Sequence, residues 1–137
     1  MPSELLLAAN TQNESILKDT VIDEVSIIET LKTEDNVNTI DKINSYKEKI
    51  SKENATIEEK NSAFDAIKLL NQISSQEELL EEKIKISYNL DSFIKIEDDQ
   101  IRVVIDSDDH TSGIANQIMR TIQENFETKK YISVNFK

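Results

Sequence analysis

The chain has 137 residues, with 27 acidic and 16 basic side chains and a net charge of −11. This charge excludes a generic nucleic-acid binder or a protein of anionic membrane surfaces, because both need clustered positive charge. The chain contains no cysteine, one histidine and one glycine, which excludes disulfides, cysteine-based zinc sites and glycine-rich phosphate loops and favours a domain that binds without a cofactor.

The segment 1–36 is predicted to be a flexible acidic spacer ahead of a domain over 37–137. It holds eight acidic and two basic residues and no aromatic residue, a composition typical of segments that cannot bury a core. Aliphatic residues cluster between Val21 and Leu31, so a helix docked on the domain is the alternative. The longest early apolar run, Leu5–Ala9, is far shorter than the roughly 20 residues that span a bilayer.

Two helices are predicted next. Isoleucines recur at helical spacing over 38–53 and indicate the first helix. The second begins with Thr56 and Glu59, which have the spacing of a capping box. No glycine or proline interrupts the pattern that follows, so we expect one long helix over 57–87. Two helices that meet near residues 74–75 are the alternative.

The hydrophobic period then changes to strict alternation. Two β-branched runs, 92–96 and 101–105, flank a short acidic turn and predict an antiparallel hairpin. A helix over 111–126 and a strand over 131–136 follow, and the last strand is expected to return parallel to the second. The sequence therefore predicts an α+β fold of α-β-β-α-β order, preceded by an extra N-terminal helix. Its three-stranded sheet carries helices on one face and is open to water on the other.

Acidic residues offer one candidate for chemistry. Asp106, Asp108 and His110 alternate as in a calcium loop, but Thr111 stands where the sharp turn needs glycine and Gln117 where a bidentate glutamate is needed. Acidic residues at a helix N-terminus are the favoured interpretation. A small metal-dependent enzyme or metal-binding domain remains the alternative function. The glutamate run over 77–82 is interpreted as surface pairing at i,i+4 spacing.

Several segments share the order and patterning of one family. They are the Glu/Lys-rich helix over 77–85, Phe93-Ile94-Lys95-Ile96, Ile101-Arg102-Val103-Val104-Ile105, Ala115-Asn116-Gln117-Ile118-Met119 and Ile132-Ser133-Val134. With these, residues 58–136 resemble the C-terminal domain of stage III sporulation protein AH of endospore-forming bacteria. Such domains are similar to the ring-building modules of type III secretion systems and flagellar basal bodies, so the resemblance implies a ring-building-motif-like fold.

The resemblance also implies a function without catalysis. Family members are anchored by an N-terminal helix in the mother-cell membrane, and that anchor is missing from this chain. They project into the space between mother cell and forespore. There they bind the degenerate peptidase-like domain of stage II sporulation protein Q and contribute to a ring, channel or zipper.

The open sheet is the predicted partner site. Its residues of interest lie on the polar face, at Phe93, Lys95, Tyr131, Ser133 and Asn135. The edge strands over 92–96 and 132–136 are expected to accept a partner strand by backbone pairing. No exposed apolar stripe is expected. Because copies of charge −11 repel one another, we expect a monomer in dilute solution and a ring only when a partner or a tether concentrates the copies.

Overall fold

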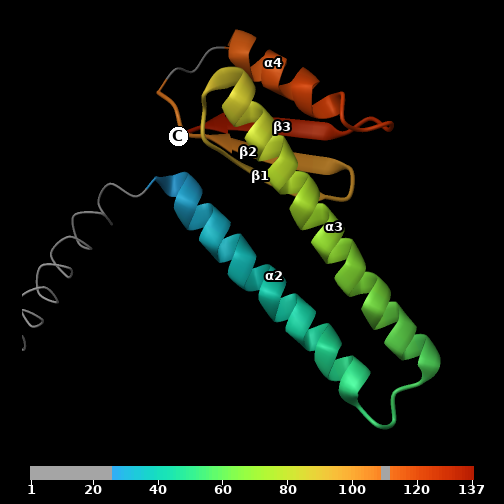
Figure 1. Cartoon of the computed structure of the whole chain (residues 1–137). Helices are drawn as coiled ribbons and strands as arrows, with labels where there is room; N and C mark the ends of the chain where they lie inside the picture. Colours follow the sequence, from blue (N-terminus) through green and yellow to red (C-terminus); the bar gives the residue numbers. More distant parts are fainter. Residues whose placement is uncertain (1–25, 109–111) are drawn as a thin grey trace, which may run out of the picture.

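The computed structural model describes residues 26–108 and 112–137, which form two long helices, a three-stranded sheet and a shorter helix (Figure 1). In chain order the elements are α2 (Ile27–Ser51), α3 (Ile57–Tyr88), β1 (Ser92–Glu97), β2 (Gln100–Ile105), α4 (Ser112–Gln123) and β3 (Tyr131–Phe136). The predicted α+β class and element order are confirmed. No helix in this part of the chain is both long enough and apolar enough to cross a membrane.

The sheet has the strand order β1-β2-β3. β1 and β2 are antiparallel, and the turn between them contains Asp98 at φ 55°, a left-handed conformation that aspartate tolerates. β3 runs parallel to β2, with Val134 opposite Val103. Because a parallel pair needs a long crossover, α4 lies between these two strands in the chain. The predicted hairpin and parallel return are both confirmed.

α3 and α4 cover one face of the sheet. Leu80 and Ile84 of α3 pack with Ile118 and Ile122 of α4 against the inward side chains of the strands, and all four are buried. Their spacing of four residues within each helix is the amphipathic pattern that the sequence shows. α4 is shorter than its predicted range of 111–126. Residue 111 lies outside the described residues.

α3 is a single helix, as predicted. Thr56 caps its start at Ile57 by accepting a hydrogen bond on Oγ1 from the Glu59 N–H at 3.0 Å, and the helix continues through residues 74–75 without a break. It ends at Tyr88 and is capped by Asn89, which adopts the left-handed conformation at φ 55° and donates its N–H to the Lys85 carbonyl at 2.9 Å. Asparagine thus takes the place that glycine most often fills after a helix.

The first helix starts well before its predicted position. α2 begins at Ile27, where the Ser26 side chain accepts from the Glu29 N–H, and it ends at Ser51. The predicted start near residue 38 and the predicted spacer boundary at 36 are therefore wrong for residues 27–36, which form the first turns of this helix. The reason is tertiary: Ile28 is buried against Phe93 and Val104. The spacer prediction for residues 1–25 lies outside the described residues.

α2 also changes the second face of the sheet. Phe93 and Val104 belong to the face opposite the α3–α4 core, and α2 covers them with Ile28 and Leu31. The expectation that helices cover only one face of the sheet is therefore wrong at Phe93 and Val104. Beyond the sheet, α2 and α3 run on side by side as an antiparallel pair that projects from the domain (Figure 1).

Candidate protein-interaction surface

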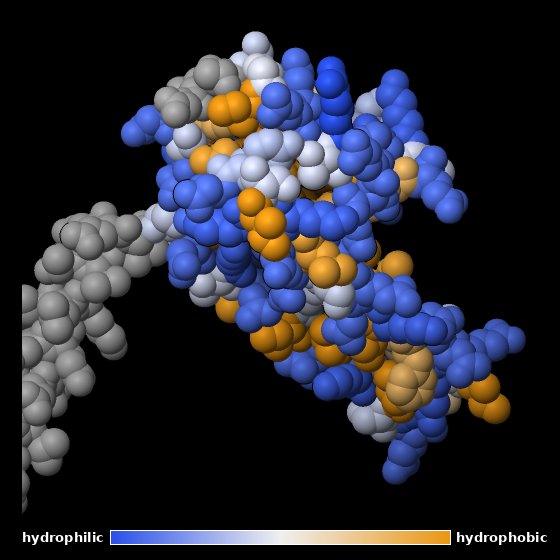
Figure 2. All heavy atoms as spheres, turned by 45° about the horizontal axis from the view of Figure 1, so that its top comes forward, coloured by the Kyte–Doolittle hydropathy of each residue, from blue (hydrophilic) through white to orange (hydrophobic). Residues whose placement is uncertain are grey.

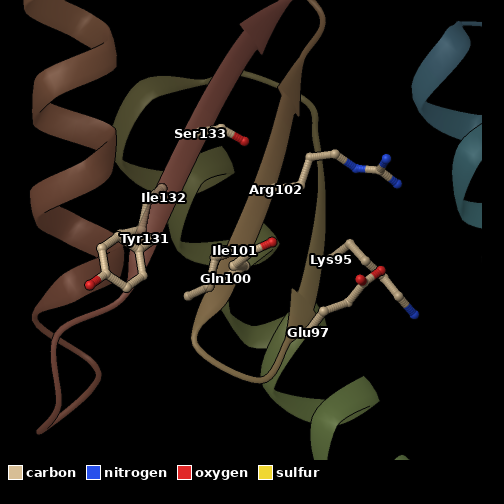
Figure 3. Close-up of a pocket in the computed structure, with 8 residues that line it drawn as sticks. All are labelled: Lys95, Glu97, Gln100, Ile101, Arg102, Tyr131, Ile132 and Ser133. Carbon is tan, nitrogen blue, oxygen red and sulfur yellow. The ribbon is translucent and has the colours of Figure 1, made fainter.

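Part of the second sheet face stays uncovered. Tyr131, Ser133 and Asn135 of β3 alternate outward and are exposed, as is Arg102 of β2. The Lys129 ammonium lies 6.0 Å from the centre of the Tyr131 ring. A shallow pocket beside the hairpin turn is lined by residues of all three strands, including Tyr131 and Ser133 (Figure 3). This surface combines an aromatic anchor with polar side chains, which is typical of protein-binding surfaces.

The five predicted partner-binding residues do not share one environment. Phe93 is buried beneath α2, so it cannot offer its ring to a partner as predicted. Lys95 is half-buried and pairs with Asp35 of α2 through an Nζ–Oδ1 distance of 2.7 Å. Tyr131, Ser133 and Asn135 remain exposed together on β3. The partner role of these three stays a prediction.

β3 has an open edge. Tyr131 N–H donates to the Asp99 carbonyl and Lys137 N–H donates to the Ile105 carbonyl, both at 2.8 Å. Since backbone groups alternate along a parallel strand, the odd-numbered residues of β3 face β2. The N–H and C=O groups of Ile132 and Val134 therefore point away from the sheet. In the described part of the chain, β3 pairs with β2 alone.

β1 has a sealed edge. Its outward N–H groups at Ile94 and Ile96 donate to the carboxylates of Glu81 and Glu77, at 2.9 and 2.8 Å. α3 thus lies along this edge and occupies the donors that a partner strand would use. The prediction that either edge strand accepts a partner is wrong for β1.

The two sealing glutamates were missed by sequence reasoning, which interpreted the run over 77–82 as surface pairing. Glu77 is buried, and Glu81 is partly buried beside the Lys32 ammonium at 3.5 Å. A signal was present in the sequence: Glu77 and Glu81 share a helical face with the buried residues Leu80 and Ile84. A glutamate on a buried stripe needs a hydrogen-bond donor, and an edge strand supplies one.

Burial raises the pKa of both Glu77 and Glu81. Desolvation raises the pKa of Glu77 to about 7 against the opposing effects of the Ile96 N–H and the Lys95 charge. Desolvation also raises the pKa of Glu81, opposed by the Ile94 N–H and by Lys32. A proton therefore binds at this edge more readily than at an ordinary carboxylate.

The candidate metal site lies only partly within the described residues. Within residues 26–108 and 112–137, no three His, Cys, Asp or Glu side chains gather as metal ligands would. Asp106 and Asp108 are exposed, and the Asp106 N–H donates to the Asp91 carbonyl at 3.0 Å. His110, the third predicted ligand, lies outside the described residues, so the proposed trio is not tested as a set.

Comparisons with known proteins agree with the resemblance. No protein-family model matches the chain. Stage III sporulation protein AH of Bacillus subtilis (strain 168) is 30% identical over 87 residues, which cover 64% of this chain and 40% of that protein. The chain thus spans about two fifths of the length of this relative.

A solved structure confirms the fold. One chain from the structure of the SpoIIQ-SpoIIIAH pore-forming complex superposes with a TM-score of 0.72 at 24% identity, covering 82% of this chain and 98% of that one. The chain is therefore a domain similar to stage III sporulation protein AH in both sequence and fold.

Proposed function

We propose that the chain is a non-enzymatic interaction domain that acts as the mother-cell component of a sporulation channel or zipper. In this proposal it stands in the intermembrane space, held by an N-terminal anchor, and binds a stage II sporulation protein Q-like degenerate peptidase domain. The observation that carries the proposal is the open β3 edge on a domain of this fold.

Two features make β3 the partner strand. The β1 edge is occupied by Glu77 and Glu81, so in the described part of the chain a partner strand finds its donors and acceptors at β3. The segment 129–137 carries three lysines and no acidic residue in a chain of net charge −11. We therefore expect the pairing strand to carry acidic side chains, because complementary charge favours the right partner and speeds encounter.

The exposed face of β3 adds a second contact. Tyr131 presents a large ring with a hydroxyl beside Ser133 and Asn135. Aromatic residues of this kind contribute most of the binding energy at many interfaces. A partner strand added at the edge would extend the sheet, and its outward side chains would lie next to these three.

The decisive variant removes one edge donor. Val134→Pro deletes an N–H that faces away from β2, so it spares the ladder to β2 and blocks the incoming strand. Val134→Ala is the matched control, because it loses the same packing against the core and keeps the donor. Ser133→Pro is unsuitable, since its N–H faces β2.

Titration calorimetry against purified stage II sporulation protein Q, with thermal melts of the same samples, provides the readout. We expect Val134→Pro to bind roughly tenfold more weakly than Val134→Ala, as follows from one lost hydrogen bond. Equal binding of two folded variants would exclude edge pairing. Absence of binding by the unaltered chain would exclude this partner.

A further inference from the structure

α3 carries an apolar stripe on its solvent side, which corrects the expectation that no such stripe exists. The exposed fractions are 77% for Ile57, 56% for Phe64, 54% for Leu79 and 76% for Ile86. Ile57 and Phe64 are seven residues apart, and so are Leu79 and Ile86. At 3.6 residues per turn these spacings return to nearly the same side of the helix. That side is opposite the one that Leu80 and Ile84 bury against the sheet.

The middle of the stripe is polar and almost uncharged. Between Phe64 and Leu79 the same side of α3 presents Lys68, Asn71, Gln72 and Ser75 around a shallow hollow. We call the eight residues Ile57, Phe64, Lys68, Asn71, Gln72, Ser75, Leu79 and Ile86 the α3 stripe. Hydrophobic residues also reach the surface at several places along the projecting helices in Figure 2.

The α3 stripe is symmetric about its own centre. The midpoint lies between Asn71 and Gln72, and Phe64 precedes it by as many residues as Leu79 follows it. The same holds for Ile57 and Ile86. A surface with this property complements a second copy of itself when the two helices run antiparallel, related by a two-fold axis perpendicular to them.

We propose that the α3 stripe is an isologous contact between two copies of this chain, with the two-fold axis passing between Asn71 and Gln72. Phe64 of one copy then packs against Leu79 of the other, and Ile57 packs against Ile86. Near the axis the amide groups of Asn71 and Gln72 face one another, and each can both donate and accept hydrogen bonds. The occupant is thus a second α3.

Charges beside the stripe fit the same arrangement. In a regular helix Glu58 and Lys83 flank one side of the stripe at its two ends, whereas Glu82 lies on the stripe itself. An antiparallel copy brings Glu58 near Lys83, because a two-fold axis perpendicular to the helices keeps each flank on its own side. Lys83 also donates to the Asn125 Oδ1, which holds its ammonium near this end of α3.

The proposed contact between two copies has a low affinity. Only four apolar residues contribute, and two copies of net charge −11 repel each other. Dilute protein therefore stays monomeric, and the dimer forms where copies are crowded or tethered in one plane, which raises their effective concentration. The inference needs no partner protein, so it fails or holds independently of the proposed function.

Cysteine cross-linking tests the geometry directly, because the chain has no cysteine of its own. Lys68→Cys and Ser75→Cys lie at equal distances on either side of the midpoint. An antiparallel dimer places residue 68 of one copy level with residue 75 of the other. The two residues 68 then lie about 10 Å apart along the axis, beyond the ~7 Å limit for a disulfide.

The expected result is a disulfide mainly between residues 68 and 75 when the two variants are mixed and oxidised, with little cross-linking in either alone. Like-with-like disulfides would indicate a parallel pair and overturn the proposal. Absence of any cross-link across a concentration series would overturn it as well.

A matched pair of variants checks specificity. Phe64→Glu adds a charge within the stripe, whereas Leu69→Glu adds it at an equally exposed residue on another side of α3. The first is expected to abolish the 68–75 disulfide and the second to leave it intact, with thermal melts to show that both variants fold. Equal loss in both variants would mean that the cross-link reports only non-specific encounters.

Discussion

Replacing Glu77 with glutamine should stabilise the protein at neutral pH. The Glu77 pKa is raised from 4.5 to about 7 in the folded state because burial disfavours the carboxylate. The folded state therefore takes up a proton more readily than the unfolded state. The stability that this proton contributes is fully present below about pH 4.5 and is lost as the pH rises to about 7.

The magnitude follows from the shift. A displacement of about 2.5 pKa units is worth about 3 kcal/mol at full ionisation. Glutamine imitates the neutral acid and keeps an oxygen that accepts the Ile96 N–H. The charged neighbours Lys95, Asp35 and Glu81 are unchanged in the variant. We thus expect Glu77→Gln to match the unaltered protein near pH 4.5 and to exceed its free energy of unfolding by up to about 3 kcal/mol near pH 8.

Urea denaturation across this pH range measures the effect. Glu82→Gln is the control, since Glu82 is an exposed glutamate on the same helix and its replacement should leave the pH dependence unchanged. Some pH dependence will persist in Glu77→Gln, because burial also raises the pKa of Glu81. A variant that is less stable than the unaltered protein near pH 8 would refute the reasoning. It would mean that the carboxylate's hydrogen bond to β1 outweighs its desolvation.

Three further predictions concern the fold. Val103→Asp places an unpaired charge in the core and should unfold the domain, whereas Arg102→Glu on the opposite face should lower the free energy of unfolding by less than about 1 kcal/mol. Thermal melts measure both effects, and equal tolerance of the two changes would contradict the strand register. Ile28→Ala should lower the free energy of unfolding by about 2–5 kcal/mol and remove amide-exchange protection from the first turns of α2. An unchanged exchange profile would mean that the start of α2 does not depend on the burial of Ile28. Asn89→Gly should raise the free energy of unfolding by about 0.5–1 kcal/mol in urea titrations, because glycine adopts φ 55° without strain; a destabilised variant would show that the asparagine side chain contributes more than its backbone strain costs.

Local periodicity made most of the fold predictable. The change from helical spacing to alternation identified the hairpin, the crossover helix and the last strand, and Thr56 identified the start of α3. Each of these signals lies within one element and is read from its own residues. The parallel return of β3 followed because the preceding helix can only cover the face that the hairpin leaves apolar.

Tertiary contacts made the rest unpredictable. The start of α2 depends on Ile28 packing against Phe93, about sixty-five residues away in the chain, within a segment whose acidic composition is typical of a linker. That contact also buries Phe93, which alternation alone had correctly assigned to the outward face. The sealing of β1 depends on two glutamates whose spacing is equally typical of exposed helix surfaces.

Residue-resolved amide exchange on addition of stage II sporulation protein Q is the most direct test of the proposed β3 contact. In the free domain the N–H groups of Ser133 and Asn135 face β2 and should already exchange slowly, whereas those of Ile132 and Val134 face outward and should exchange fast. Pairing with a partner strand predicts that Ile132 and Val134 become protected while the amides of β1 at Ile94 and Ile96 do not change. Binding without protection of Ile132 and Val134 would contradict the account and place the partner on another surface.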